Sequence, residues 1–254
     1  MSVSIGIRSY LDAASSTERD SLEEHSSLVD VIERMDGLFR RLVAGRWRSD
    51  AHPICGFLGM NAHANFLAAS TAAFRGQSPA TFMLLRGSLE SALYAFLISL
   101  CRDDGEAWMA RAQDPVRAKA LFSANRGIQK LKLRDQNLAA MAKETYEWMI
   151  DFGGHPNPRS IVDHVRVAEQ ESNGDVSMSL IYINSAESLA VVRAIAACIE
   201  NGCMVLAILA HTFPEHDDSA DVFSQAWEIF REFEQYAIED GYLSSDWSQS
   251  SSTE

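Results

Sequence analysis

Apolar side chains recur at helical spacing along most of this chain. The pattern predicts long helices over about 20–48, 54–75, 79–101, 128–152, 185–212 and 218–240, and short ones over about 104–112 and 115–125. Ser78 followed by Pro79 is a usual helix start, and Gly153 with Gly154 is a usual helix stop. The Ser/Thr-rich stretch Ala13–Asp20 is interpreted as a loop or cap before the first helix.

Residues 155–184 interrupt this pattern. The two prolines of His155-Pro156-Asn157-Pro158 exclude a continuous helix there. Asn173-Gly174 lies between two partly alternating β-branched runs, which predicts a β-hairpin near 160–183. The competing interpretation is a short helix over 160–169 followed by a lone strand.

The expected fold is mainly α, a multi-helix bundle of about seven to nine helices with the small hairpin inserted. A chain of 254 residues that is 47% hydrophobic is long enough for a sizeable core. We expect a single helical domain over 21–242, a peripheral N-terminal segment over 1–20 and a Ser-rich disordered tail over 243–254.

Two apolar segments, 79–101 and 186–213, are long enough to span a membrane. Charged residues interrupt both, and charges at mid-helix are costly in hydrocarbon, so we expect core helices and no membrane partner. The four cysteines form no Cys-x-x-Cys pair and lie in apolar helical context. With no signal-peptide pattern at the start, these features predict free thiols and a cytoplasmic location.

The net charge of −13 is unevenly distributed. Residues 214–254 hold eleven acids and one base, whereas residues 115–134 hold six bases and no acid. The acidic end argues against broad nucleic-acid binding. The basic stretch is the one segment suited to face phosphate, or it is a solvated face or a partner for the chain's own acidic end.

Arg86 and Glu90 are the strongest candidate site residues. They lie one turn apart on the same face of an apolar helix, so they should pair or line a wet pocket. In a pocket, Arg86 would hold a carboxylate or phosphate and Glu90 would act as a base. The alternative is an internal ion pair that fixes helix register. Gly87 leaves room for another backbone or a ligand to approach.

His155 is the second candidate, because it lies on a glycine-flanked turn before two prolines. An imidazole near its reference pKa is a usable acid or base, and the alternative is a turn histidine bonded to the backbone. Arg159 and His164 are close in sequence and could join it. We expect His155 and His164 as catalytic candidates beside Glu90, and Arg86, Glu90, His155 and Arg159 as binding residues.

No metal or cofactor site is predicted. His52, Cys55 and His63 form the tightest group of imidazole and thiol ligands, but no further pair of ligands has a recognisable spacing. The phosphate-loop, dinucleotide-binding, Gly-x-Ser-x-Gly and His-Glu-x-x-His motifs are all missing from the sequence.

Two segments carry a family resemblance. Leu-Leu-Arg-Gly-Ser-Leu-Glu-Ser-Ala-Leu-Tyr (84–94), followed by Tyr146 and then Phe-Gly-Gly-His-Pro-Asn-Pro (152–158), resembles a group of uncharacterised bacterial helical proteins that are loosely similar to HEPN domains. Some HEPN domains are ribonucleases of toxin–antitoxin or phage-defence systems. Their signature is an Arg and a His four to six residues later, near a helix start. Two pairs here have that spacing, Arg46 with His52 and Arg159 with His164.

Two functions follow as expectations. The first is a cytoplasmic binding or interaction module that forms a homodimer and takes a protein partner or small anionic ligand, with Arg86, Glu90 and His155 lining its pocket. The second is a HEPN-like, metal-independent ribonuclease. In that case His155 or His164 would be the acid or base, Arg86 or Arg159 the phosphate clamp, and residues 117–134 would guide RNA.

Overall fold

Helix α10 (Leu189–Thr212) forms the centre of the structure, a computed structural model that describes residues 6–43, 52–154, 165–167, 178–180 and 183–239. Most α10 side chains are apolar or small and are buried. A helix that is apolar all round must be covered on all sides. Five helices pack against it: α2 (Ser26–Val43), α3 (Pro53–Phe74), α4 (Ser78–Leu100), α8 (Gln136–Met149) and α11 (Ser219–Glu239).

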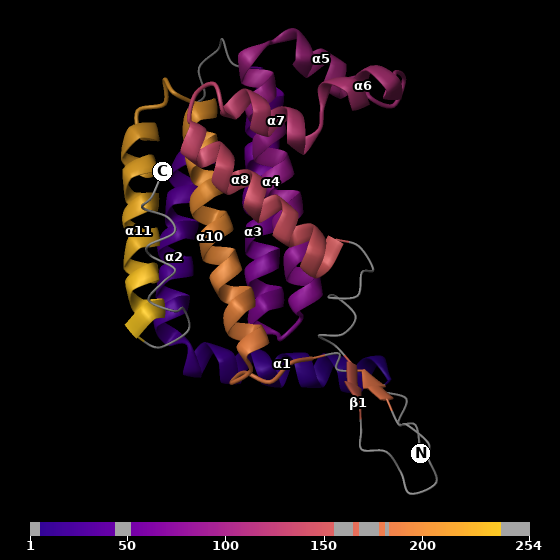
Figure 1. The fold of residues 1–254 in the computed structure, drawn as a ribbon, viewed down its shortest axis with the longest axis vertical. Coiled ribbons are helices and arrows are strands. Elements are labelled where there is room, and N and C mark those ends of the chain that lie inside the picture. The colour runs from indigo at the N-terminus through magenta and orange to yellow at the C-terminus, as the bar shows by residue number, and fades with distance from the viewer. Residues whose placement is uncertain (1–5, 44–51, 155–164, 168–177, 181–182, 240–254) are drawn as a thin grey trace, which may run out of the picture.

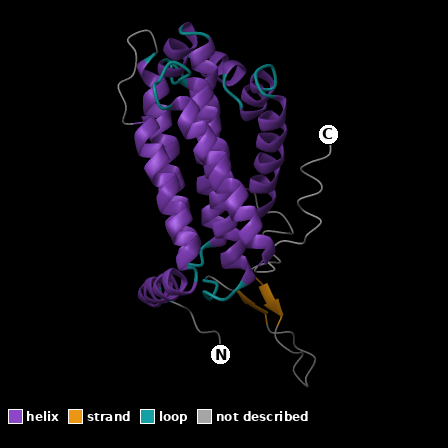
Figure 2. Cartoon of the chain, turned by 90° about the vertical axis from the view of Figure 1, so that its left-hand side faces the viewer, coloured by secondary structure: helices purple, strands orange, loops and turns teal. Residues whose placement is uncertain are grey.

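Long helices run side by side along the long axis, and other helices lie at the two ends (Figures 1 and 2). At one end α1 (Ile7–Glu24) lies across the bundle. At the other end lie α5 (Asp103–Met109), α6 (Pro115–Leu121) and α7 (Ala124–Leu131). A π-helical turn, η1 (Ile150–Gly154), continues α8. The expected mainly α bundle is confirmed.

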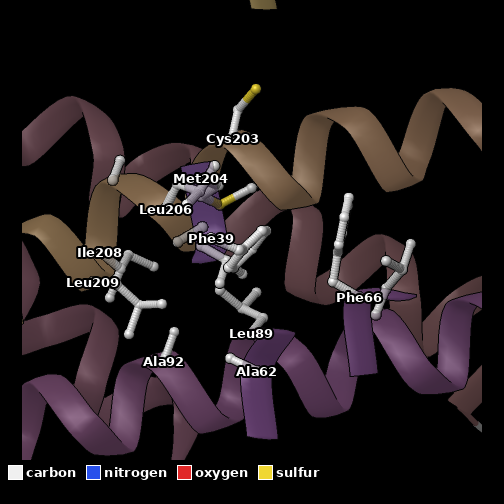
Figure 3. Packing of buried hydrophobic residues seen from close by; sticks show 14 of the residues in the cluster. Phe39, Ala62, Phe66, Leu89, Ala92, Cys203, Met204, Leu206, Ile208 and Leu209 are labelled. Atoms are coloured by element: carbon white, nitrogen blue, oxygen red, sulfur yellow. The ribbon is translucent and has the colours of Figure 1, made fainter. Parts of the chain in front are cut away.

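The centre of the core is built from large side chains of α2, α3 and α4 that pack against α10 (Figure 3). Phe39 of α2 and Phe66 of α3 are fully buried, with ring centroids 4.9 Å apart. Leu89 of α4 and Leu206 of α10 are equally buried nearby. Since removing a large buried side chain costs several kcal/mol, this cluster is the main source of stability.

The turn between α3 and α4 is fastened to the segment before α10. Gly76 has a φ of +71°, which favours glycine, and an added Cβ would come within 2.2 Å of the Asn184 backbone oxygen. The Asn184 amide donates to the Gly76 oxygen at 3.1 Å, and its side chain donates to the same oxygen at 3.2 Å. This contact joins residues more than 100 positions apart.

The predicted loop over Ala13–Asp20 is wrong, because these residues belong to α1. Its buried positions are occupied by small side chains, Ala14, Thr17 and Ser21, which do not give a strong apolar pattern. The helix is held by tertiary contacts instead, since Glu18 pairs with Arg75 at 3.0 Å. Of the predicted N-terminal segment 1–20, residues 1–5 lie outside the described part.

The predicted single helix over 128–152 is also wrong. A turn at residues 132–135 separates α7 from α8, and the Asp135 carboxylate caps α8 by accepting from the Leu138 amide at 2.9 Å. In the same way Ser188 caps α10, which begins at Leu189 and not at the predicted residue 185. In both cases an N-cap residue marks the true helix start.

Two short strands, β1 (Val165–Val167) and β2 (Met178–Leu180), pair antiparallel, with Arg166 opposite Ser179. The residues that would connect them lie outside the described part, so the hairpin near 160–183 stays a prediction. The alternative helix over 160–169 is wrong where the structure describes it, because residues 165–167 form strand β1. The predicted tail over 243–254 lies outside the described part.

Helices α4 and α10 have the length and hydropathy of membrane-spanning helices. More than half of each apolar window is buried inside the bundle, as the core helix of a soluble protein also is.

Candidate functional site

Arg86 and Glu90 pair on α4, as their spacing predicts. The Arg86 Nε donates to Glu90 Oε1 at 2.9 Å. The two side chains are 28% and 27% exposed, so the pair is neither sealed in the core nor freely solvated. A half-buried pair loses less to solvent screening than one on the open surface.

Tyr146 of α8 completes this group, which we call the Arg86–Glu90–Tyr146 cluster. Its hydroxyl donates to Glu90 Oε1 at 2.8 Å, so one carboxylate oxygen accepts from two helices. The Arg86 guanidinium carbon lies 5.2 Å from the centroid of the Tyr146 ring, within cation–π range. The sequence marks Tyr146 as part of a family resemblance but does not predict its contact with Glu90. The available signal was its hydroxyl, because a buried tyrosine usually finds a polar partner.

The electrostatics of the cluster keep its phenols protonated. Burial raises the pKa of Tyr146, and the hydrogen bond to Glu90 raises it further. Burial, with the negative charge of Glu90, raises the pKa of nearby Tyr94 to about 12. Burial is the largest single influence on Arg86 and would lower its pKa, but the hydrogen bond to Glu90, the negative charge of Glu90 and the contact with Tyr146 together outweigh it, so the pKa is raised. The two phenols are therefore hydrogen-bond donors and poor bases at neutral pH.

The space beside Gly87 is taken by the neighbouring helix. A Cβ at Gly87 would lie 3.2 Å from Oδ1 of Asn65 on α3. One turn further along, Asn61 donates to Ser91 at 2.8 Å, and Ser91 donates to the Gly87 carbonyl at 2.7 Å. The glycine thus permits a close, polar contact between α3 and α4, and the room predicted there is filled by a side chain.

His155, Arg159 and His164 lie outside the described residues, so their meeting with Arg86 and Glu90 stays a prediction. The last described residues before His155, which belong to η1, lie near the start of α4. Phe152 packs on Phe82, with ring centroids 5.6 Å apart, and Gly153 lies against the Pro79 carbonyl. The segment that leads to His155 therefore passes within about two turns of Arg86 along α4.

His52, Cys55 and His63, the tightest group of possible metal ligands in the sequence, do not point toward a common centre. The His52 ring caps α3 by accepting from the Ile54 amide at 3.2 Å. Cys55 is buried and donates to the Ala95 carbonyl, while His63 pairs with Asp36 at 2.7 Å. Within the described ranges, no three His, Cys, Asp or Glu side chains are placed to hold a metal ion.

A shallow groove of about 530 Å³ lies between α2 and α11, away from the helices that form the cluster. Ion pairs cross it: Arg41 contacts Asp218 at 3.0 Å and Asp221 at 2.6 Å, and Arg34 contacts Glu232. Its charged groups neutralise one another and are exposed, which suits a solvated helix seam more than a ligand pocket.

Comparison with known proteins adds no relative. The chain matches no protein-family model, no curated protein and no solved structure.

Proposed function

We propose that this protein is a helical interaction module that self-associates through one uncharged face of its bundle. The face is formed by the exposed side chains of Phe57, Met60 and Leu67 on α3 and Met83 on α4, and we call it the α3–α4 face. The observation that carries the proposal is the composition of α3. Its 22 residues include no Asp, Glu, Lys or Arg, although one side of the helix is open to solvent.

On one side of this apolar helix, no described residue provides a cover. Met60 is 47% exposed and Leu67 is 40% exposed. Helices that are apolar all round are normally buried, and contiguous exposed apolar surface marks interaction sites. The Arg86–Glu90–Tyr146 cluster borders this surface on α4, and its charges are already paired. In this proposal the cluster lies at the edge of the α3–α4 face and stabilises it, and it does not line a ligand pocket.

The partner proposed is a second copy of the chain. Each copy carries a net charge of −13, so two copies repel one another wherever their acidic surfaces meet. The α3–α4 face is where they can approach without opposing like charges. The small residues Ala64 and Ala68 lie between its larger side chains, giving a ridged surface that a two-fold axis can pack against itself.

Sedimentation velocity on the full chain tests this proposal. We expect a dimer for the wild type and a monomer for Met60→Glu combined with Leu67→Glu. Leu189→Glu is the matched control, since Leu189 is 49% exposed at the start of α10, outside the face. The control should remain dimeric, and all variants should melt near the wild-type temperature. A wild type that is monomeric at high micromolar concentration, or a face variant that stays dimeric, rejects the proposal.

The ribonuclease alternative depends on His155 or His164 as the acid or base and on Arg86 or Arg159 as the phosphate clamp. Of these residues only Arg86 lies in the described part, where it pairs with Glu90, and no contact there favours hydrolysis over binding. Cleavage of RNA by the full chain, lost on substitution of His164, would support the alternative.

A further inference from the structure

The end of the bundle formed by α5, α6 and α7 combines exposed aliphatic side chains with unneutralised bases. Val116 is 80% exposed and Leu133 is 78% exposed, the highest values for large apolar side chains among the described residues. Both lie within residues 115–134, the stretch with six bases and no acid. Each also has bases close by in sequence, Arg117 and Lys119 in one case and Lys132 and Arg134 in the other. An exposed aliphatic side chain next to basic side chains thus occurs twice at this end of the bundle.

Helix α6 has little to hold it against the bundle. It has seven residues and buries none of their side chains, and α5 and α6 project beyond the long helices in Figure 1. Residues 109–117 are exposed throughout. Helices this short are unstable in water unless something packs on them or caps them. Here Asp114 caps α6, and the Arg126 guanidinium holds its C-terminal part through the Ala120 carbonyl at 3.1 Å. The outer side of α6 therefore has no covering element in the described structure.

Five bases of residues 115–134 have no acidic partner among the described residues. Arg117, Lys119, Lys130, Lys132 and Arg134 are all exposed, and none forms an ion pair with a described residue. This differs from α2, where Arg34, Arg40 and Arg41 are each paired with an acid. The same end carries the acids Asp103, Asp104 and Glu106 on α5. Residues 115–134 contain no acid, so their five unpaired cations still make a local surface for an anionic partner in a strongly acidic protein.

We propose that this end of the bundle binds an anionic lipid surface. Lysine and arginine side chains would contact lipid phosphates, while Val116 and Leu133 would enter the boundary between headgroups and acyl chains. The contact is peripheral and reversible, and it departs from the sequence expectation that the chain has no membrane partner. The acids of α11 lie on the far side of the bundle from α6, so salt screening limits their repulsion from the lipid at the α6 part of this surface.

The aromatic side chains at this end favour lipid over nucleic acid. Single-stranded nucleic acids are bound by stacking of bases on exposed aromatic rings. Here Trp108 and Phe122 are turned toward α4, with ring centroids 5.0 Å apart and 5.2 and 5.8 Å from Tyr94. Aliphatic side chains occupy the exposed positions instead. They gain little from a phosphate backbone and much from a lipid interface.

Flotation of the full chain with vesicles tests the inference. We expect binding to phosphatidylcholine vesicles that contain phosphatidylserine, little binding to phosphatidylcholine alone, and release by salt. Lys119→Gln and Lys132→Gln should each weaken binding about fivefold, the usual effect of one base near an anionic surface. Val116→Ser combined with Leu133→Ser should also weaken it several-fold, whereas the matched control Leu189→Ser should not.

Two results would overturn the inference. One is failure of the wild type to float with anionic vesicles at low salt. The other is a Val116→Ser, Leu133→Ser variant that floats like the wild type while an RNA oligonucleotide displaces both proteins, because that pattern identifies a surface for polyanions in general. Neither result depends on self-association, which the sedimentation of the same samples reports separately.

Discussion

Tyr146 and Glu90 are 56 residues apart in sequence, and the hydroxyl of one donates to the carboxylate of the other at 2.8 Å. This contact ties α8 to α4 beside the Arg86 ion pair. It means that the conspicuous charges of α4 serve to attach a second helix. Their contribution to stability can be measured separately from any binding function.

Tyr146→Phe should lower the free energy of unfolding by about 1 to 2 kcal/mol, because it deletes a hydrogen bond to a charged acceptor and keeps the ring. Urea denaturation followed by circular dichroism measures this. Tyr10→Phe is the matched control, since the Tyr10 hydroxyl accepts from the neutral amide of Gln77 at 3.0 Å. Tyr10→Phe should lower the free energy of unfolding by less than Tyr146→Phe does. Equal losses at both positions would argue against the charge-assisted bond.

Arg86→Ala should lower the free energy of unfolding by about 1 kcal/mol, because it leaves a half-buried carboxylate without its cation and uncovers the Tyr146 ring. The chain offers a control with the same spacing. Lys143 and Glu147 on α8 are 64% and 63% exposed and 3.7 Å apart, so Lys143→Ala should cost only about 0.3 kcal/mol. Thermal melts at low and high salt compare the two. If Arg86→Ala is as mild as its control, the pair is not structural.

Stability should fall as the pH rises through the range set by Glu200. Burial, followed by the nearby carboxylates of Glu234 and Glu144, raises the pKa of Glu200 from 4.5 to about 7. Between those values the folded state keeps a proton that the unfolded chain has lost. Its stabilising effect is complete below pH 4.5 and is lost as the pH approaches 7.

Glu200→Gln should remove most of that slope and stabilise the protein at pH 8 by something on the order of 2 kcal/mol. Chemical denaturation at several pH values measures the effect. A smaller slope of the same sign should remain, because burial also raises the pKa of Glu234. A variant with the wild-type slope would show that the Glu200 carboxylate is well solvated.

Gly76→Ala should lower the free energy of unfolding by about 2 kcal/mol or more, a large effect for the addition of one methyl group. The residue has a positive φ, and the new Cβ would overlap the backbone of Asn184. Gly37→Ala is the control, because a Cβ there would meet nothing within 4 Å. That variant should be neutral or slightly stabilising, since alanine favours the helix. If both variants lose a similar amount of stability, the loss at Gly76 does not come from overlap with Asn184.

One thiol should react in the native protein. Cys101 is exposed, whereas Cys55, Cys198 and Cys203 are buried. Burial also raises the pKa of Cys55 and Cys198 to about 12. A thiol-reactive dye should label one site before denaturation and four afterwards. Cys101→Ser should abolish the native reaction, and persistent labelling would reveal opening of the core.

Much of the bundle follows from the sequence because its long helices carry strong local signals. The start of α4 at Ser78-Pro79 and the pairing of Arg86 with Glu90 both depend on neighbours within one turn. α1 could not be found this way, because its buried face consists of small residues and its stability comes from distant partners such as Arg75. Tyr146 was missed for a related reason. Helical periodicity identifies a buried face but not the acceptor that a hydroxyl on it will meet.

The attachment of α1 also has a consequence for the order of events during synthesis. His25, just after α1, is buried and bonded to the Ala186 carbonyl at 3.0 Å, a partner 161 residues away. A ribosome must therefore extend the chain by most of its length before the first helix can reach its final place. Until then His25 cannot form its native hydrogen bond to Ala186. Contacts of such high sequence separation form late, which makes closure of this end a slow step of folding.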